Sequence, residues 1–118
     1  MEIEIDGRPI GLNYAPYLVA ELSANHNGCI DRAKQTIDAA LASGAEAVKL
    51  QTYTPDTMTI DCDKPDFLIS NGPWEGYRLY DLYCEAHTPY EWHRELFDYG
   101  KSSGITVFST PFDETAVD

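Results

Sequence analysis

The amino-acid sequence predicts an α/β fold in which strands and helices alternate along the chain. Short apolar runs that begin near residues 17, 45 and 105 are typical of buried strands. Two segments between those runs, residues 31–43 and 88–103, carry apolar residues at helical spacing. Because strand, helix and strand follow one another through short connections, we expect the strands to pair in parallel.

The first elements are a hairpin and a strand. Residues 2–5 alternate polar and apolar side chains, Asp6-Gly7 is a turn signal, and residues 8–10 return, which predicts a small β-hairpin. Residues 17–21 then form the first strand of the parallel sheet.

Both helices are predicted with defined ends. The first, residues 31–43, is followed by Gly44, a residue typical of the position just after a helix. For the second, we expect Thr88 as the N-cap, Pro89 at the first helical position and Glu91 completing a capping box.

The central strand, residues 45–53, combines an apolar and a polar face. Side chains alternate across a strand, so Lys49, Gln51 and Tyr53 share one face, and the apolar residues between them share the other. The polar face is expected to line a cavity or a barrel interior, where Lys49 could bind an anionic substrate. The alternative is a lysine whose stem packs while its ammonium group reaches water.

Residues 54–86 interrupt the pattern as a long loop with a helical turn at 77–85, and a loop of this length is usually functional, for example a lid. A third strand follows at 105–109, and residues 114–118 resemble the start of a helix. Because this arrangement leaves a parallel sheet with an unpaired edge, we expect the N-terminal segment of a longer enzyme. A complete small α/β domain is the alternative.

Composition limits the partners. Twenty acidic residues against eight basic ones give a net charge of −12, which argues against nucleic acid or an anionic membrane surface. No apolar run approaches the ~20 residues of a membrane span, and the acidic N-terminus is unlike a signal peptide. The three cysteines are odd in number and widely spaced, so reduced thiols in a cytoplasmic protein are expected.

Polar residues follow the predicted strands at their carboxyl ends, where ligands bind in parallel α/β folds. The first strand end carries Glu21, Asn25 and His26, the second carries Lys49, Gln51 and Tyr53, and the third carries Ser109 and Thr110. Parallel pairing would bring these three sets together. Each residue also has a structural alternative, such as a turn residue, a cap or a buried histidine.

Three segments of the chain resemble the sialic acid synthase family. They are residues 20–28 (AELSANHNG), 48–56 (VKLQTYTPD) and 108–112 (FSTPF). The runs at 72–74 and 79–93 are most similar to the branch of the family that makes pseudaminic acid. The branches that make N-acetylneuraminic or legionaminic acid are the alternatives.

The resemblance implies that residues 1–118 are the N-terminal part, about three βα units, of a TIM (β/α)8 barrel. An antifreeze-like domain would follow it, in a homodimer. It implies condensation of phosphoenolpyruvate with a six-carbon diacetamido sugar to give a nine-carbon acid and phosphate. A divalent metal, manganese or magnesium, would polarise the sugar aldehyde from ligands that lie outside this segment. The segment alone is then expected to be inactive.

The resemblance also implies roles for single residues. Glu21 would contact the sugar, Lys49 would hold phosphoenolpyruvate beside Gln51, and Thr110 would lie in the phosphoenolpyruvate pocket. Asn25, His26 and Tyr53 would lie near the sugar, and the three histidines of the segment are not expected to bind the metal.

Two further classes of function stay open from the residues alone. A lysine near the end of a barrel strand can act as a Schiff-base nucleophile, as in an aldolase. A non-catalytic segment that self-associates through its sheet edge is the other possibility.

Overall fold

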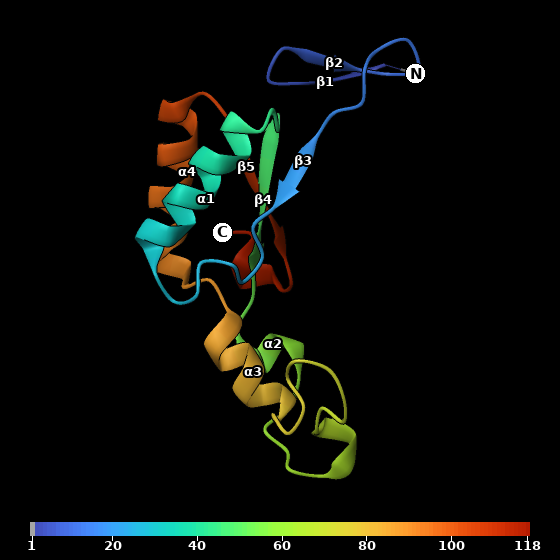
Figure 1. The fold of residues 1–118 in the computed structure, drawn as a ribbon, viewed down its shortest axis with the longest axis vertical. Coiled ribbons are helices and arrows are strands. Elements are labelled where there is room, and N and C mark those ends of the chain that lie inside the picture. The colour runs from blue at the N-terminus through green and yellow to red at the C-terminus, as the bar shows by residue number, and fades with distance from the viewer. Residues whose placement is uncertain (1) are drawn as a thin grey trace.

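The computed structural model describes residues 2–118, which form a hairpin and a separate parallel sheet (Figure 1). The hairpin pairs β1 (Ile3–Ile5) with β2 (Arg8–Ile10) in antiparallel fashion. The sheet contains β3 (Val19–Glu21), β4 (Ala47–Thr52) and β5 (Thr106–Pro111) in the order β3-β4-β5, and both pairings are parallel. The hairpin and the parallel α/β arrangement predicted from the sequence are therefore confirmed.

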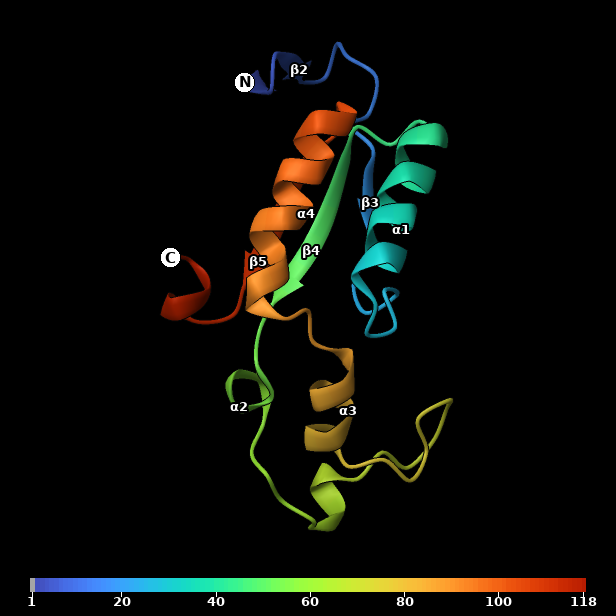
Figure 2. The ribbon, with the colours of Figure 1, turned by 90° about the vertical axis from the view of Figure 1, so that its left-hand side faces the viewer.

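Two helices, α1 (Ile30–Ala42) and α4 (Tyr90–Ser103), lie side by side on one face of the sheet (Figure 2). Their apolar sides bury Ile37 and Leu96 against Val48 and Leu50 of the sheet. Gly44 follows α1 with a φ of 87°, a left-handed conformation that favours glycine, as the sequence indicates. In residues 2–118, no helix is both long enough and apolar enough to cross a bilayer.

The start of α4 differs from its prediction. The helix begins at Tyr90 with Pro89 as its N-cap, and no side chain caps it. Thr88 instead turns its hydroxyl to His26, with 3.2 Å between Thr88 Oγ1 and His26 Nε2. The expected capping box was therefore wrong, because the buried imidazole binds the hydroxyl that would have capped the helix.

The opposite face of the sheet is left without a helix among the described residues. Register pairs Ala20 with Val48 on the helix side, and it pairs Glu21 with Lys49 on the other side. Strand alternation thus gives β4 an apolar, packed face and an open face that carries Lys49 and Gln51, as predicted for the central strand.

The segment after β4 is an excursion with short helices rather than one long loop. It contains α2 (Pro55–Met58), η1 (Pro65–Phe67) and α3 (Leu79–Ala86). It extends beyond the carboxyl ends of the strands and makes the molecule elongated, 49 × 32 × 29 Å (Figure 1). Arg78 binds carboxylates on both sides of the excursion, Asp61 at 2.7 Å and Asp81 at 2.6 Å.

The end of the chain also differs in detail from its prediction. β5 continues to Pro111, two residues beyond the expected strand. After it, Glu114–Ala116 form a short 3-10 helix, η2. The side chain of Asp113 accepts from the main-chain amide of Ala116.

Candidate functional site

The open face of the sheet carries a cation and an anion at the centre. Glu21 on β3 and Lys49 on β4 are register partners, and Lys49 Nζ lies 2.8 Å from Glu21 Oε2. Their side chains are 39% and 36% exposed, so the ion pair is accessible to a ligand from solvent. Sequence alternation and parallel pairing together place these two residues as expected.

A second row of polar groups lies one step nearer the carboxyl ends of the strands. Gln51 on β4 is the register partner of Thr110 on β5, and both share the face of Lys49. The hydroxyl of Ser23 donates to Gln51 Oε1 over 3.2 Å, which orients the amide. The structure therefore brings Glu21, Lys49, Gln51 and Thr110 onto one open surface.

Ser109, which the sequence grouped with Thr110, belongs to the other face. Its hydroxyl lies 2.6 Å from that of Thr52, and the Thr52 hydroxyl lies 2.6 Å from His93 Nε2. Neighbouring strand residues point to opposite faces, so these three groups link the sheet to α4.

His26 is fully buried behind the loop that follows β3. Its Nδ1 accepts from the main-chain amide of Gly28 at 3.0 Å, and its ring packs edge-on against Trp92 at 5.4 Å. Burial lowers the pKa of His26, and the neighbouring His87 lowers it further. The structure thus gives His26 the structural role that was its alternative, joining the loop to α4.

Asn25 and Tyr53 were the other two residues expected near the sugar. Asn25 is exposed, and its amide donates to the carbonyl of Leu22 at 2.8 Å, so it closes the turn after β3. Tyr53 is only 5% exposed and lies edge-on between Tyr83 and Phe112. Burial raises the pKa of the Tyr53 phenol. Through its contact with Tyr83, the Tyr53 side chain connects the excursion to the sheet.

Sequence reasoning missed two residues of the open face. Phe108 is the register partner of Lys49 on β5, and Ser23 orients Gln51. Counting back two positions from Thr110 along the strand would have found Phe108. Ser23 has no such signal, because a loop residue does not follow strand alternation.

The arrangement suits recognition of an anion next to hydroxyl groups. The ammonium of Lys49 can bind a phosphate or carboxylate, and the hydroxyl of Thr110 can add a donor. The carboxylate of Glu21 can accept from sugar hydroxyls. In residues 2–118, no group of three or more His, Cys, Asp or Glu side chains could hold a metal ion, so the described residues do not fit the expected divalent metal.

Comparisons with known proteins identify the family and agree with the fold. The chain matches the model of the NeuB family over residues 36–118. It is 48% identical to a pseudaminic acid synthase from Campylobacter jejuni over 102 residues, which cover 86% of this chain and 30% of that protein. It is 35% identical to an N,N'-diacetyllegionaminic acid synthase from Legionella pneumophila over 112 residues, covering 94% of this chain and 31% of the relative.

Among solved structures, the crystal structure of the spore coat polysaccharide biosynthesis protein SpsE from Bacillus subtilis superposes with a TM-score of 0.70 at 30% identity. The superposition covers all of this chain and 30% of SpsE. The α/β fold of this chain is thus shared with part of SpsE.

The chain belongs to the NeuB family, that is, the sialic acid synthase family. Its identity to the pseudaminic acid synthase is higher than its identity to the legionaminic acid synthase. The chain spans about 30% of the length of these relatives.

Proposed function

We propose that this chain is the N-terminal part of a (β/α)8 barrel that condenses phosphoenolpyruvate with a six-carbon diacetamido sugar, giving pseudaminic acid and phosphate. The observation that carries the proposal is the open face, where Glu21, Lys49, Gln51 and Thr110 meet with no helix over them among residues 2–118. In a closed barrel this face would be the interior, and ligands bind at the carboxyl ends of barrel strands.

Lys49 would hold phosphoenolpyruvate in this proposal. A ligand with two or three negative charges can take over the ammonium that Glu21 binds at 2.8 Å in this structure. Thr110 would add a neutral donor, and Gln51 would add an amide held in place by Ser23.

Glu21 would bind the acceptor sugar. Its carboxylate is displaced from Lys49 when the phosphate ester binds, and it is then free to accept from hydroxyl groups of the sugar. The same side chain would thus connect the two substrates, because release of Glu21 accompanies binding of the first. The divalent metal stays a proposal for residues outside this chain, and none of these steps depends on it.

The Schiff-base alternative is less well supported by the site. A nucleophilic amine must be neutral, with a free electron pair, whereas Lys49 forms an ion pair with a carboxylate. Its neighbours Gln51 and Thr110 are neutral hydrogen-bonding groups that suit an anion.

The test is turnover in an enzyme of the relatives' length that contains this segment. Phosphate release and the mass of the nine-carbon product are measured with phosphoenolpyruvate and the diacetamido sugar. Lys49→Ala is expected to lower kcat/KM by about 100-fold, roughly 2.7 kcal/mol of transition-state stabilisation.

The matched control is Lys34→Ala, which removes a lysine of α1 that forms an ion pair with Glu95 of α4, on the helix side of the sheet. This variant is expected to keep kcat/KM within about twofold, because surface ion pairs contribute little. Product formation by Lys49→Ala at the rate of the unmodified enzyme would remove Lys49 from the site, and a borohydride-trapped adduct on Lys49 would favour the aldolase reading.

A further inference from the structure

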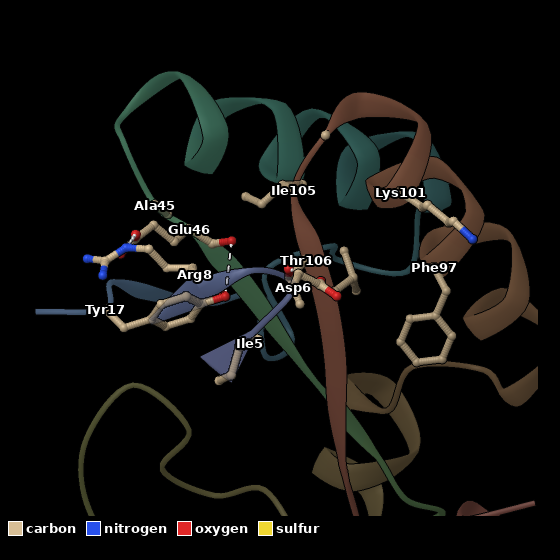
Figure 3. Close-up of a pocket in the computed structure, with 12 residues that line it drawn as sticks. Ile5, Asp6, Arg8, Tyr17, Ala45, Glu46, Phe97, Lys101, Ile105 and Thr106 are labelled. Atoms are coloured by element: carbon tan, nitrogen blue, oxygen red, sulfur yellow. Dashed lines mark hydrogen bonds and ion pairs between the residues drawn. The ribbon is translucent and has the colours of Figure 1, made fainter. Parts of the chain in front are cut away.

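The base of the sheet, at the end opposite the polar strand ends, contains a cavity of about 740 Å³ (Figure 3). Arg8 and Tyr17 point toward Glu46 there, and Asp6 lies beside Thr106. Arg8 and Glu46 form an ion pair, with 2.5 Å between Arg8 Nε and Glu46 Oε1, and Asp6 accepts from the hydroxyl of Thr106. The contacts that line the cavity therefore connect the hairpin to the base of the sheet.

Beside this cavity, Glu46 forms two hydrogen bonds with the main chain of Leu18. Its Oε2 accepts from the Leu18 amide at 3.0 Å, and its own amide donates to the Leu18 carbonyl at 2.8 Å. The Leu18 side chain is 55% exposed, so packing contributes little at this position. The main chain just before β3 is thus held by Glu46 and by the amide of Ala47, which also donates to the Leu18 carbonyl, at 3.2 Å; Glu46 alone adds a side-chain contact.

Arg8 fixes the carboxylate that makes one of these contacts. Besides Glu46, its guanidinium donates to the carbonyl of Ala15 at 3.0 Å, which ties the hairpin to the segment leading into β3. The Leu18 amide and Arg8 both lower the pKa of Glu46. Hydrogen bonds to a charged carboxylate are stronger than those between neutral groups.

The strand that follows depends on such anchors. β3 has three residues and pairs only with β4 among the described residues. Its far end is held by Leu22, which is buried in the core. Because each strand residue advances the chain by about 3.3 Å and turns the side chain over, a slip of one residue would separate Glu21 from Lys49.

We infer that Glu46 is a positioning residue: clamped by Arg8, it fixes the register of β3 on β4 and so holds Glu21 opposite Lys49 at the other end of the sheet. The structural part of this inference stands on the contacts alone. Its catalytic part rests on the proposed function.

Hydrogen exchange followed by mass spectrometry tests the structural part in the purified protein. Glu46→Ala is expected to speed exchange of the amides from Val19 to Leu22 by about 10-fold or more, since loss of a charge-assisted anchor opens the strand locally. Exchange in α1 and at the β4–β5 pairing is expected to stay within about twofold. Glu46→Gln keeps an oxygen for the Leu18 amide and is expected to give an intermediate effect.

The control is Glu95→Ala, which removes the carboxylate of another ion pair, with Lys34 at 2.5 Å, from the outer surface of the helices. It is expected to leave exchange in β3 unchanged. Unchanged β3 exchange in Glu46→Ala overturns the inference. Faster exchange spread evenly over the whole sheet overturns it as well, because that outcome shows general destabilisation instead of local positioning.

Turnover of the full-length enzyme tests the catalytic part. Glu46→Ala is expected to lower kcat by about 10-fold without raising the KM for phosphoenolpyruvate, since Lys49 stays on β4 and loses the carboxylate that competes with this ligand. Glu46→Gln is expected to recover part of kcat. Faster β3 exchange with unchanged kcat overturns the positioning role. If the unmodified enzyme itself makes no product, the proposed function fails. The exchange experiment then still tests whether Glu46 holds β3 on β4.

Discussion

His26 shows how one buried side chain links stability to pH. The structure favours its neutral form, with Nδ1 accepting from the Gly28 amide, and burial lowers the pKa below its usual value of 6.5. Above about pH 6.5 both the folded and unfolded chains hold a neutral imidazole, so its contribution to stability is fully present. As the pH falls below that value, the unfolded chain binds the proton first and stability is lost.

We therefore expect the free energy of unfolding in urea to fall between pH 7.5 and pH 5.5, by about 1.4 kcal/mol for each unit of pKa difference that is traversed. His26→Gln keeps an amide in the buried position and has no imidazole to titrate, so its stability should change less over this interval. Equal slopes for the two proteins would show that other groups, such as the carboxylates, account for the loss.

Among single residues, the shared face of Glu21, Lys49, Gln51 and Thr110 could be predicted. It follows from strand alternation and from parallel pairing of the strands. The environments of His26 and Tyr53 could not be predicted. His26 is buried by Thr88 and Trp92, more than sixty residues away in the chain, and Tyr53 by Tyr83 and Phe112. Burial of that kind depends on tertiary partners that no short motif contains.

At the scale of elements, α4 packs closely against β5 at Gly100. Gly100 is buried on α4, and a Cβ at this position would collide with the side chain of Val107 and lie 3.2 Å from the carbonyl of Ile105. A glycine inside a helix costs about 1 kcal/mol relative to alanine, so packing against the strand must offset that cost.

Gly100→Ala is accordingly expected to destabilise the protein. Overpacking costs about 1–3 kcal/mol, which exceeds the gain in helix propensity. The double variant Gly100→Ala/Val107→Ala removes the colliding methyl groups, so its loss should be smaller than the sum of the two single losses. Denaturant unfolding measures all three, with Asp98→Ala on the exposed side of α4 as the control; simple additivity would contradict the predicted collision.

The helix end that was predicted from a glycine is correct, whereas the helix start that was predicted from a threonine is not. Gly44 adopts the left-handed conformation after α1, and few other residues do so at low cost. Thr88 can act either as a cap or as a partner of a buried group, and only the folded arrangement decides between the two. The excursion after β4 was predicted as irregular because its helices are too short for a clear apolar period.

At the scale of the whole molecule, the described residues leave apolar surface on the open side of the sheet. Val19 on β3 and Phe108 on β5 are 45% and 40% exposed, and each of these two strands pairs on one side only in residues 2–118. Open strand edges and apolar surface together favour association between chains.

We expect sedimentation velocity on the 118-residue chain to show dimers or larger species whose fraction rises with concentration. Phe108→Lys should reduce that fraction, because a charge on an exposed strand opposes edge pairing. Ile60→Lys, at an exposed position on the excursion, is the matched control and should leave it unchanged. A single monomeric boundary at every concentration would contradict the prediction.

The contact between Glu21 and Lys49 also has a consequence for selectivity in a chain with a net charge of −12. Every incoming anion must compete with a carboxylate that is already attached to the scaffold. A singly charged competitor such as acetate or chloride gains little by the exchange, whereas a multiply charged phosphate ester gains more. The open face would in this way select ligands by the number of their negative charges before any contact that depends on their shape.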